Sequence, residues 1–476
     1  MRTSIFATAI LTLAIAAQSF AQLPEDALRF ATPGIGVGAR AVGMGGAYTG
    51  VASDYSAIYW NPAGLSQSAY GEFSIGLNYN SLATTGTLFG NDKSTTINST
   101  NLNSLGLVYP LPVRRGSAAI AFGFHRQNSF ADGFSFEGFN PNSSIIQTYA
   151  PNGTTAPSDL SNNIAYQLFL ANVDTLTGQF DSPIVNRLTQ LGRVVEGRGL
   201  NNWSVGGSFE IAKNFSVGAT LNYVAGSYRY DRTYTEEDRQ RLYESFPFDF
   251  NSLAITDYIE SDISGLNAKF GLLYRNPDRF RFGITIQTPT SFNIRETYGT
   301  TAEAHFDNGD VEPSGGPYTY DASTEYNVVT PWVFGAGASL MLQDLVLAAD
   351  VQLTDWTQVE FADADPSVMQ QNNDIKTLFR TTFDYRFGAE YEFKDIGLRL
   401  RGGYMFNRSP FEGDPSKFDR KAVTGGIGIL LGESTMIDLA VVHGWWETFV
   451  YNYSATSRVD QKTTANTAML TLTHRF

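Results

Sequence analysis

From residue 71 onward, hydrophobic and polar residues alternate with a period of two, which is the spacing of side chains on the two faces of a β-strand. In the segment LVLAADVQLTDW, every second residue from Leu345 to Leu353 is apolar, whereas Asp350 and Gln352 lie between them. The last segment alternates in the same way and ends on Phe476. Each segment therefore has one face suited to an apolar environment and one suited to a wet lumen.

Fourteen such segments follow one another, near residues 71–80, 102–111, 116–129, 201–211, 214–230, 263–275, 279–296, 322–341, 344–357, 380–393, 396–406, 418–431, 434–446 and 465–476. Their length of about ten residues or more matches a tilted strand that crosses a membrane. The connections PVRRGS, AKN, RNPDR, LQD, KDI and GES are short, and the connections between them are long. This alternation is typical of periplasmic turns and extracellular loops.

These features predict an all-β fold, a transmembrane antiparallel β-barrel of about 14 strands. A soluble β-sandwich would also show alternating strands. The asymmetry of the connections favours the barrel, and so do the 24 Tyr and 34 Phe residues of the 476-residue chain, because such side chains suit the girdles at the membrane interfaces.

Two of the long connections contain their own apolar patterns. Residues 160–197 show helical spacing, which predicts two short helices outside the membrane. Residues 235–260 begin with the charged run TEEDRQRLYESF, and we expect an apolar cluster in this extracellular loop. The cluster comprises Phe246, Phe248, Phe250, Leu253, Ile255 and Tyr258.

The N-terminal residues fit neither pattern. Residues 1–21 have a basic start, an apolar run and small residues before Gln22, which predicts a secretory signal peptide cleaved after Ala21. We therefore divide the chain into a signal peptide (1–21), a segment inside the lumen that we call the hatch (22–68), and a β-barrel with long extracellular loops (69–476).

The composition of the chain limits the kinds of partner and reaction that it can have. The net charge of −14 argues against a nucleic-acid partner, and the absence of cysteine excludes disulfides and thiolate chemistry. The four histidines are scattered, and neither H-E-x-x-H nor G-x-S-x-G occurs. The sequence thus predicts no enzyme, no cofactor and no metal site. The acidic pairs Asp307/Asp310 and Asp363/Asp365 could hold Ca²⁺, but their spacing is not that of an EF-hand and favours solvated carboxylates.

The run GIGVGARAVGMGG could suggest a dinucleotide-binding loop. No strand precedes it and no βαβ unit follows it, so the context is wrong. Glycines that allow tight backbone packing inside a narrow pore explain the run better.

Several charged residues fall on the inward parity of the predicted strands: Lys269, Arg281, Asp350, Asp384, Arg386, Arg399, Arg401 and Asp438. Opposite charges on one lumenal surface can pair and fasten a plug to the wall. The alternative is that one cation, Lys269 or Arg386, binds the carboxylate of an amphipathic ligand.

The run ARAVGMGGAYTGVASDYSAIYWNPAGL (residues 39–65) resembles the plug signature of the FadL/TodX family of outer-membrane transporters for hydrophobic compounds. Further matching segments are TPWVFGAG (330–337), LVLAADVQLTDWTQVEF (345–361), DYRFGAEYEF (384–393), RGGYMFNRSP (401–410) and FDRKAVTGGIGI (418–429). The resemblance covers nearly all of the chain after residue 21.

This resemblance implies a bacterial outer-membrane channel whose hatch plugs the lumen. Asn61, Pro62 and Ala63 would lie near a kink in the third strand, which would fall between Gly123 and Arg126 and include His125. Ligand would be captured at extracellular loops, be bound in the lumen and leave sideways into the membrane. The residues implied in ligand binding are Phe246, Phe248, Phe250, Lys269 and Arg386.

The expected partners are a long-chain fatty acid or another hydrophobic small molecule and the outer-membrane lipid, with the chain acting as a monomer. One alternative remains within the same barrel type: the shuttle protein of the type IX secretion system has a similar plug signature and binds protein cargo. A purely structural or adhesive barrel is a third hypothesis.

Overall fold

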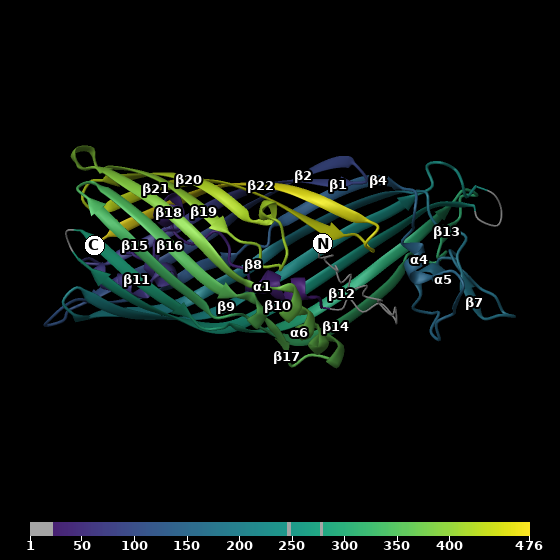
Figure 1. Cartoon of the computed structure of the whole chain (residues 1–476), viewed down its shortest axis with the longest axis horizontal. Helices are drawn as coiled ribbons and strands as arrows, with labels where there is room; N and C mark the ends of the chain where they lie inside the picture. The colour runs from purple at the N-terminus through teal and green to yellow at the C-terminus, as the bar shows by residue number, and fades with distance from the viewer. Residues whose placement is uncertain (1–21, 245–248, 277–278) are drawn as a thin grey trace, which may run out of the picture.

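The computed structural model describes residues 22–244, 249–276 and 279–476, and these residues form a closed antiparallel β-barrel (Figure 1). The predicted signal peptide lies outside the described residues. The barrel closes because β1 pairs with both β2 and β22. Its eleven continuous strands are β1 (Glu72–Leu88), β2 (Asn91–Leu111), β8 (Leu188–Ala212), β9 (Phe215–Glu237), β10 (Phe250–Arg275), β16 (Leu345–Asp355), β18 (Thr381–Phe393), β19 (Leu398–Asn407), β20 (Arg420–Leu431), β21 (Thr435–Tyr451) and β22 (Arg458–Arg475).

Three further strands are interrupted, which brings the total to the fourteen that the alternation predicts. They are β3 (Ala118–Asn128) with β4 (Asp132–Asn140), β11 (Phe280–Gln287) with β12 (Ser291–Phe306), and β14 (Tyr318–Val329) with β15 (Val333–Leu342). Pro289 and Pro331 lie in the second and third interruptions. Proline has no N–H for the ladder, so a break at these positions is expected.

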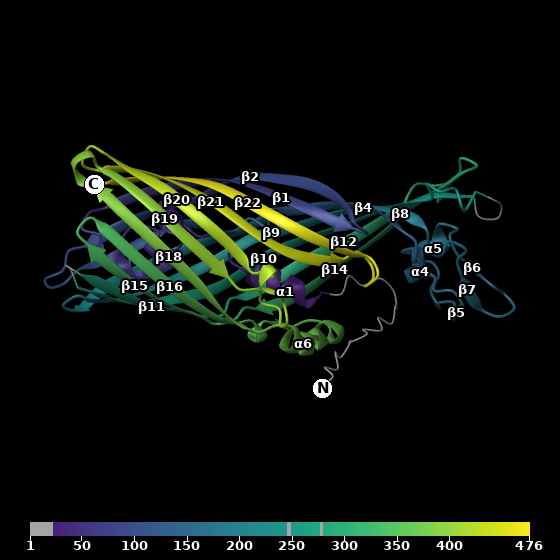
Figure 2. The ribbon, with the colours of Figure 1, turned by 45° about the horizontal axis from the view of Figure 1, so that its top comes forward.

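Smaller elements decorate the extracellular side (Figures 1 and 2). They are α4 (Ile146–Tyr149), β5 (Thr154–Thr155), α5 (Ile164–Gln167), β6 (Asn172–Val173), β7 (Gln179–Asp181), β13 (Val311–Glu312), η2 (Trp356–Gln358), β17 (Glu360–Ala362), α6 (Pro366–Leu378) and η4 (Ser416–Phe418), whereas η3 (Lys394–Ile396) forms a short turn at the opposite rim. None of the helices in the described ranges is long and apolar enough to cross a membrane.

The two structured loops differ from the sequence prediction. Instead of two helices within 160–197, the structure has one helical turn, α5, and from Leu188 onward the chain is strand β8. Likewise, β9 extends to Glu237 and β10 begins at Phe250, so residues 250–260, which hold most of the predicted apolar cluster, are strand and not loop. Pairing of β8 with β9 over their whole length satisfies the backbone of these segments, and this tertiary ladder overrides the local helical spacing.

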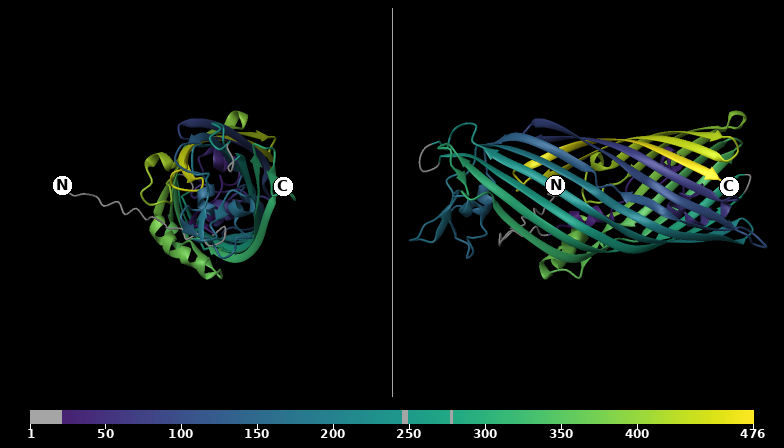
Figure 3. Two further views of the ribbon diagram at one scale, coloured as in Figure 1. Left: turned by 90° about the vertical axis from the view of Figure 1, so that its right-hand side faces the viewer. Right: turned by 180° about the vertical axis from the view of Figure 1, so that it is seen from behind.

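The hatch residues lie inside the barrel, as the end-on view shows (Figure 3, left). They form four short helices: α1 (Pro24–Ala31), α2 (Ala39–Gly43), α3 (Ala57–Trp60) and η1 (Pro62–Gln67). Tyr48, Tyr55 and Ile58 of the hatch are almost completely buried and share one apolar cluster with Val108 and Ala119 of the wall. The hatch and the barrel therefore share a common core.

Glycines on the inner face of the wall bring the two backbones close together. A Cβ atom at Gly271 would lie 2.1 Å from Oδ1 of Asn61, and one at Gly283 would lie 2.3 Å from the carbonyl oxygen of Thr49. Distances this short cannot be accommodated without a shift. The wall therefore needs glycine at these positions for the hatch to be seated.

Replacing Gly271 with Ala should displace the hatch and lower the stability of the protein by about 1–3 kcal/mol, the usual cost of overpacking. The matched control is Gly207→Ala, because a Cβ at Gly207 meets nothing closer than 3.7 Å. Thermal unfolding of both purified variants in detergent measures the difference. Equal midpoints for the two variants would contradict a tight seat at Gly271.

Candidate functional site

The barrel wall has a seam between the second and third strands. Backbone pairing of β2 with β3 ends at Ser104 and His125, and β4, which continues the third strand, pairs only with β8 in the described part of the chain. Side chains bridge β2 and β4: Thr95 Oγ1 donates to Ser135 Oγ at 2.8 Å. We call the stretch of β2 from residue 91 to 103, together with the facing residues 126–140, the wall seam.

The interruption of the third strand lies later than the resemblance implied. Gly123 is regularly paired with Gly106 and Ser204, and the strand breaks only after Asn128. Gly123 has another role, because a Cβ there would lie 2.5 Å from the hydroxyl oxygen of Tyr55. The prediction of a kink from Gly123 to Arg126 is therefore wrong at Gly123 and agrees with the structure at the other end of the range, where pairing with β2 ends at His125 and the register with β8 shifts between Arg126 and Asn128.

Residues 32–38 of the hatch, which we call the strap, hydrogen-bond to both edges of the wall seam. On the β3 side, the Gly34 N–H donates to the Gln127 carbonyl at 2.8 Å, and Asn128 Nδ2 donates to the Thr32 carbonyl at 3.0 Å. On the β2 side, Asn103 Nδ2 donates to the Gly36 carbonyl at 3.0 Å. The strap thus supplies partners that a neighbouring strand would otherwise provide.

The strap explains the glycines of GIGVG. Gly36 and Gly38 have φ angles of 103° and 83°, which residues with a side chain rarely adopt. A Cβ at Gly36 would also lie 2.6 Å from the indole ring of Trp60. The glycines are needed for close backbone approach, as predicted.

Asn61 fastens the next part of the hatch. Its side chain is fully buried, and Nδ2 donates to the carbonyl oxygens of Thr49 (2.8 Å) and Leu272 (3.1 Å). Its Oδ1 accepts from the Ala63 N–H at 3.1 Å and so caps η1. Pro62, at the start of η1, is also buried. Asn61 therefore ties the hatch to β10 and does not contact the wall seam directly.

A lumenal cavity of about 90 Å³ lies between the hatch and the wall. It brings together three residues that the sequence singled out separately, His125, Lys269 and Arg386. Tyr59 and Trp60 of the hatch form another part of its lining. The polar remainder of the lining consists of Thr49, Gln127, Asn202, Asn222, Asn267, Thr285, Gln287, Thr290, Thr330, Gln352 and Thr354.

Neither cation in this cavity forms an ion pair with any carboxylate of the described residues. Lys269 Nζ donates to the Tyr59 carbonyl at 2.7 Å and lies 5.0 Å from the centre of the Tyr59 ring. The Arg386 guanidinium lies 5.6 Å from the Trp60 ring, and its Nη2 donates to Gln352 Oε1 at 3.3 Å. Both cations therefore rest on the hatch aromatics.

Unpaired polar atoms also gather here. Five side-chain atoms that line the cavity are buried and have no hydrogen-bond partner among the described residues: His125 Nδ1, Gln127 Oε1, Asn202 Oδ1, Thr354 Oγ1 and Arg386 Nε. Buried polar groups are usually satisfied. Such a concentration around one cavity indicates a place for a polar ligand group.

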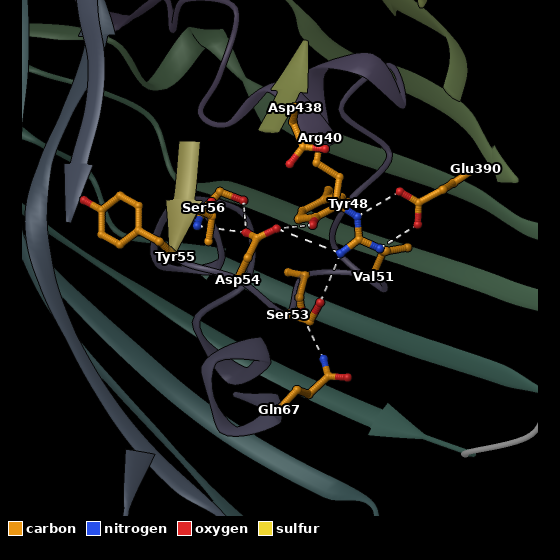
Figure 4. A network of polar contacts seen from close by, with 12 residues as sticks. Arg40, Tyr48, Val51, Ser53, Asp54, Tyr55, Ser56, Gln67, Glu390 and Asp438 are labelled. Atoms are coloured by element: carbon orange, nitrogen blue, oxygen red, sulfur yellow. Dashed lines mark hydrogen bonds and ion pairs between the residues drawn. The ribbon is translucent and has the colours of Figure 1, made fainter. Parts of the chain in front are cut away.

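Several other lumenal charges are paired, as the structural interpretation of the sequence expected, and Figure 4 shows the contact of Arg40 with Glu390. Arg40 of α2 binds both carboxylate oxygens of Glu390, at 2.9 and 2.7 Å. Arg401 bridges Glu390 and Asp438, each at 2.6 Å. Asp350 accepts hydrogen bonds from two hatch N–H groups. Arg40 and Asp350 thus fasten the hatch to the wall, whereas Arg401 joins wall residues to one another. Lys269, Arg386 and Arg281 form no ion pair within the described residues, and Arg281 donates to the Val51 carbonyl.

The aromatic residues expected in a loop groove do not join this site. Phe250 is fully buried in an apolar cluster at the extracellular tip, together with Leu253 and Ile255. Phe246 and Phe248 lie outside the described residues. The structure therefore gives no support for a ligand-capture groove formed by these aromatic residues.

Sequence reasoning gave no role to Tyr59, Trp60 or Asn103. Tyr59 and Trp60 directly precede Asn61-Pro62-Ala63, so the signature placed them in the right neighbourhood. Asn103, on the inward face of β2, had no distinguishing signal.

Comparison with known proteins agrees with the architecture. The chain resembles the Pseudomonas putida toluene transporter TodX (14% identity, TM-score 0.57, 93% of this chain and 99% of that one). It also resembles a Pseudomonas aeruginosa FadL homologue (14%, 0.55, 92% and 98%) and the CymD monoaromatic hydrocarbon channel (16%, 0.53, 93% and 98%). At such identities the similarity shows a shared fold. No curated protein sequence matches the chain.

The family model described as outer membrane protein transport protein (OMPP1/FadL/TodX) matches residues 189–476, which is more than half of the sequence. The matched residues comprise the barrel from β8 to β22, whereas the hatch and the wall seam precede them in the chain. The chain belongs to the OMPP1/FadL/TodX family of outer membrane transport proteins.

Proposed function

We propose that this chain takes up hydrophobic compounds that carry an acidic head group, with long-chain fatty acids as the first candidates. Its family transports hydrophobic small molecules through the outer membrane. The proposal concerns which compounds pass and which residues handle them.

The observation that carries the proposal is the pair of cations, Lys269 and Arg386, neither of which forms an ion pair in the described residues, although Asp350 lies opposite Arg386 on the neighbouring strand. Partly buried cations are costly unless an anion or several hydrogen bonds compensate for lost hydration. By contrast, Arg40 binds both carboxylate oxygens of Glu390. A ligand carboxylate would supply the missing charge and accept hydrogen bonds from both cations.

The cavity fits a head group and not a whole ligand. Its volume of about 90 Å³ is below the ~150 Å³ of an apolar cavity that accommodates benzene, and much of its lining is polar. The apolar space beside it is filled by α1, whose Phe30 packs edge-on against Phe130 (6.0 Å) and Tyr228 (5.9 Å). An aliphatic tail would bind by displacing Phe30 and its neighbours from this cluster.

Release through the wall seam follows from the physics of the ligand. Each buried CH₂ group contributes about 0.8 kcal/mol, so a long tail strongly favours passage from the lumen directly into lipid over a path through water. The wall seam is one of the interruptions of strand pairing beside the cavity. At the interruptions with Pro289 and Pro331, the Thr330 N–H still donates to the Thr290 carbonyl at 3.0 Å. His125 lines the cavity and ends the pairing.

Replacing both Lys269 and Arg386 with Met should weaken oleate binding by about tenfold to a hundredfold per cation, because hydrogen bonds to charged groups contribute about 1.5–3 kcal/mol. Isothermal titration with purified protein in detergent measures this. Lys394→Met is the matched control, since Lys394 is on the periplasmic turn and 66% exposed.

Methyl oleate is the matched control ligand, because it keeps the tail and lacks the charge. Its affinity should be unchanged by the two substitutions. If oleate binds equally well to the doubly substituted and native proteins, the head-group site is elsewhere.

A covalent link between hatch and wall should block uptake. The Oγ atoms of Ser66 and Ser216 are 2.8 Å apart, and the chain has no cysteine of its own, so Ser66→Cys with Ser216→Cys offers one defined disulfide. In a strain that lacks the native protein, uptake of radiolabelled oleate should fall at least tenfold when the bond is oxidised. A reducing agent should restore uptake.

The two single cysteine variants serve as controls, and heat-dependent gel mobility checks that the barrel has assembled. Full uptake with the disulfide formed would show that this end of the hatch does not move during transport.

A further inference from the structure

Tyr59 and Trp60 connect the two cavity cations with the strap. Their rings meet edge-on with centres 4.9 Å apart. Lys269 contacts Tyr59, and Arg386 lies over Trp60. On its other side Trp60 holds the strap: its indole N–H donates to the Val37 carbonyl at 2.8 Å, and its ring packs against Gly36.

These contacts form a continuous route from the cavity to the wall seam. Gly36, which touches Trp60, also accepts a hydrogen bond from Asn103 at the β2 edge. Tyr59 additionally packs edge-on against His125, with ring centres 5.4 Å apart. A movement of Tyr59 and Trp60 would therefore reach both edges of the wall seam.

The contacts of the two cations with the rings themselves are weak, although Lys269 also donates a hydrogen bond to the Tyr59 carbonyl. A cation–π contact contributes about 0.5–2 kcal/mol, whereas a charge-assisted hydrogen bond to a carboxylate is shorter and stronger. A carboxylate in the cavity would thus draw Lys269 away from Tyr59 and Arg386 away from Trp60. An uncharged ligand offers no such competition.

We propose that Tyr59 and Trp60 are the specificity-determining residues of the gate, which convert the charge of a bound head group into release of the strap. The inference rests on the proposed function and deepens it. Selection then has two stages: any hydrophobic compound of suitable shape can bind, but only one with an anionic head group opens the wall seam.

The test measures how accessible the strap is to a reagent, and it does not measure transport. In Val37→Cys, the introduced thiol is the only one in the chain and replaces a fully buried side chain of the strap. Its rate of reaction with N-ethylmaleimide in detergent reports strap opening. Saturating oleate should raise this rate at least fivefold, and saturating methyl oleate should leave it unchanged.

Substitutions of either aromatic residue should uncouple the strap from the head group of the ligand. In the Val37→Cys background, Tyr59→Leu should raise the rate without ligand and abolish the difference between acid and ester. Trp60→Phe, which lacks the indole N–H, should do the same. Tyr59→Phe is the matched control, because it keeps the ring and the backbone carbonyl that Lys269 contacts, and it should behave like the native residue.

The outcomes separate this inference from the proposed function. If oleate and methyl oleate both bind and open the strap equally, the gate does not sense charge and the inference fails while uptake of hydrophobic compounds stands. If Tyr59→Leu keeps the native acid-to-ester difference, Tyr59 is not part of the route. If neither compound binds by titration, the proposed function itself fails.

Discussion

Every backbone N–H and C=O group inside a bilayer must find a partner within the protein, because lipid offers none. The rest of this structure depends on how that constraint is met at the wall seam, where backbone pairing between β2 and the third strand ends. On the β3 edge the strap supplies a backbone partner, because the Gly34 N–H donates to the Gln127 carbonyl. On the β2 edge the side chain of Asn103 donates to the strap. The hatch is thus part of the wall as well as a plug.

Because of this arrangement, the wall seam is closed only while the strap stays in place. A strand neighbour would hold the edge with a long ladder, whereas the strap holds it with few hydrogen bonds and with the packing of Trp60 on Gly36. When a ligand displaces the strap, the edge of the wall seam is exposed for as long as the ligand occupies the position of the strap. A lateral exit can therefore exist without an open sheet edge in the resting state.

The charges of the lumen divide into two sets with different consequences. Removing one member of a buried pair typically costs about 3–5 kcal/mol, so the pair of Arg40 with Glu390 anchors α2 of the hatch to the wall. Lys269 and Arg386 are held by aromatic rings and neutral oxygens instead. The hatch is firmly anchored where it meets β18 to β21 and loosely held where it meets the cavity.

Period-two alternation was enough to predict the barrel, its strand number and the inward parity of Lys269 and Arg386, because side chains alternate strictly between lipid and lumen. The prediction of two helices within residues 160–197, which rested on helical spacing, was wrong. Part of this segment pairs in the long β8–β9 ladder, which no local pattern in the sequence reveals. The resemblance brought attention to Asn61 and His125, which lie at two different contacts of the hatch with the wall. Their separation reflects pairings between residues more than sixty positions apart.

The role of Tyr59 illustrates why the remaining part of the site could not be predicted. A tyrosine before Asn-Pro has no chemical signature of its own, and its importance comes from position: Lys269 arrives from β10, His125 from β3, and both meet the same ring. Each of these residues is unremarkable on its own strand. A weak contact also suits this place, since a carboxylate salt bridge to Lys269 within the protein would satisfy the cation permanently and leave a ligand nothing to displace. The absence of such a bridge from the described cavity is therefore the feature that makes a charge-sensitive gate physically possible.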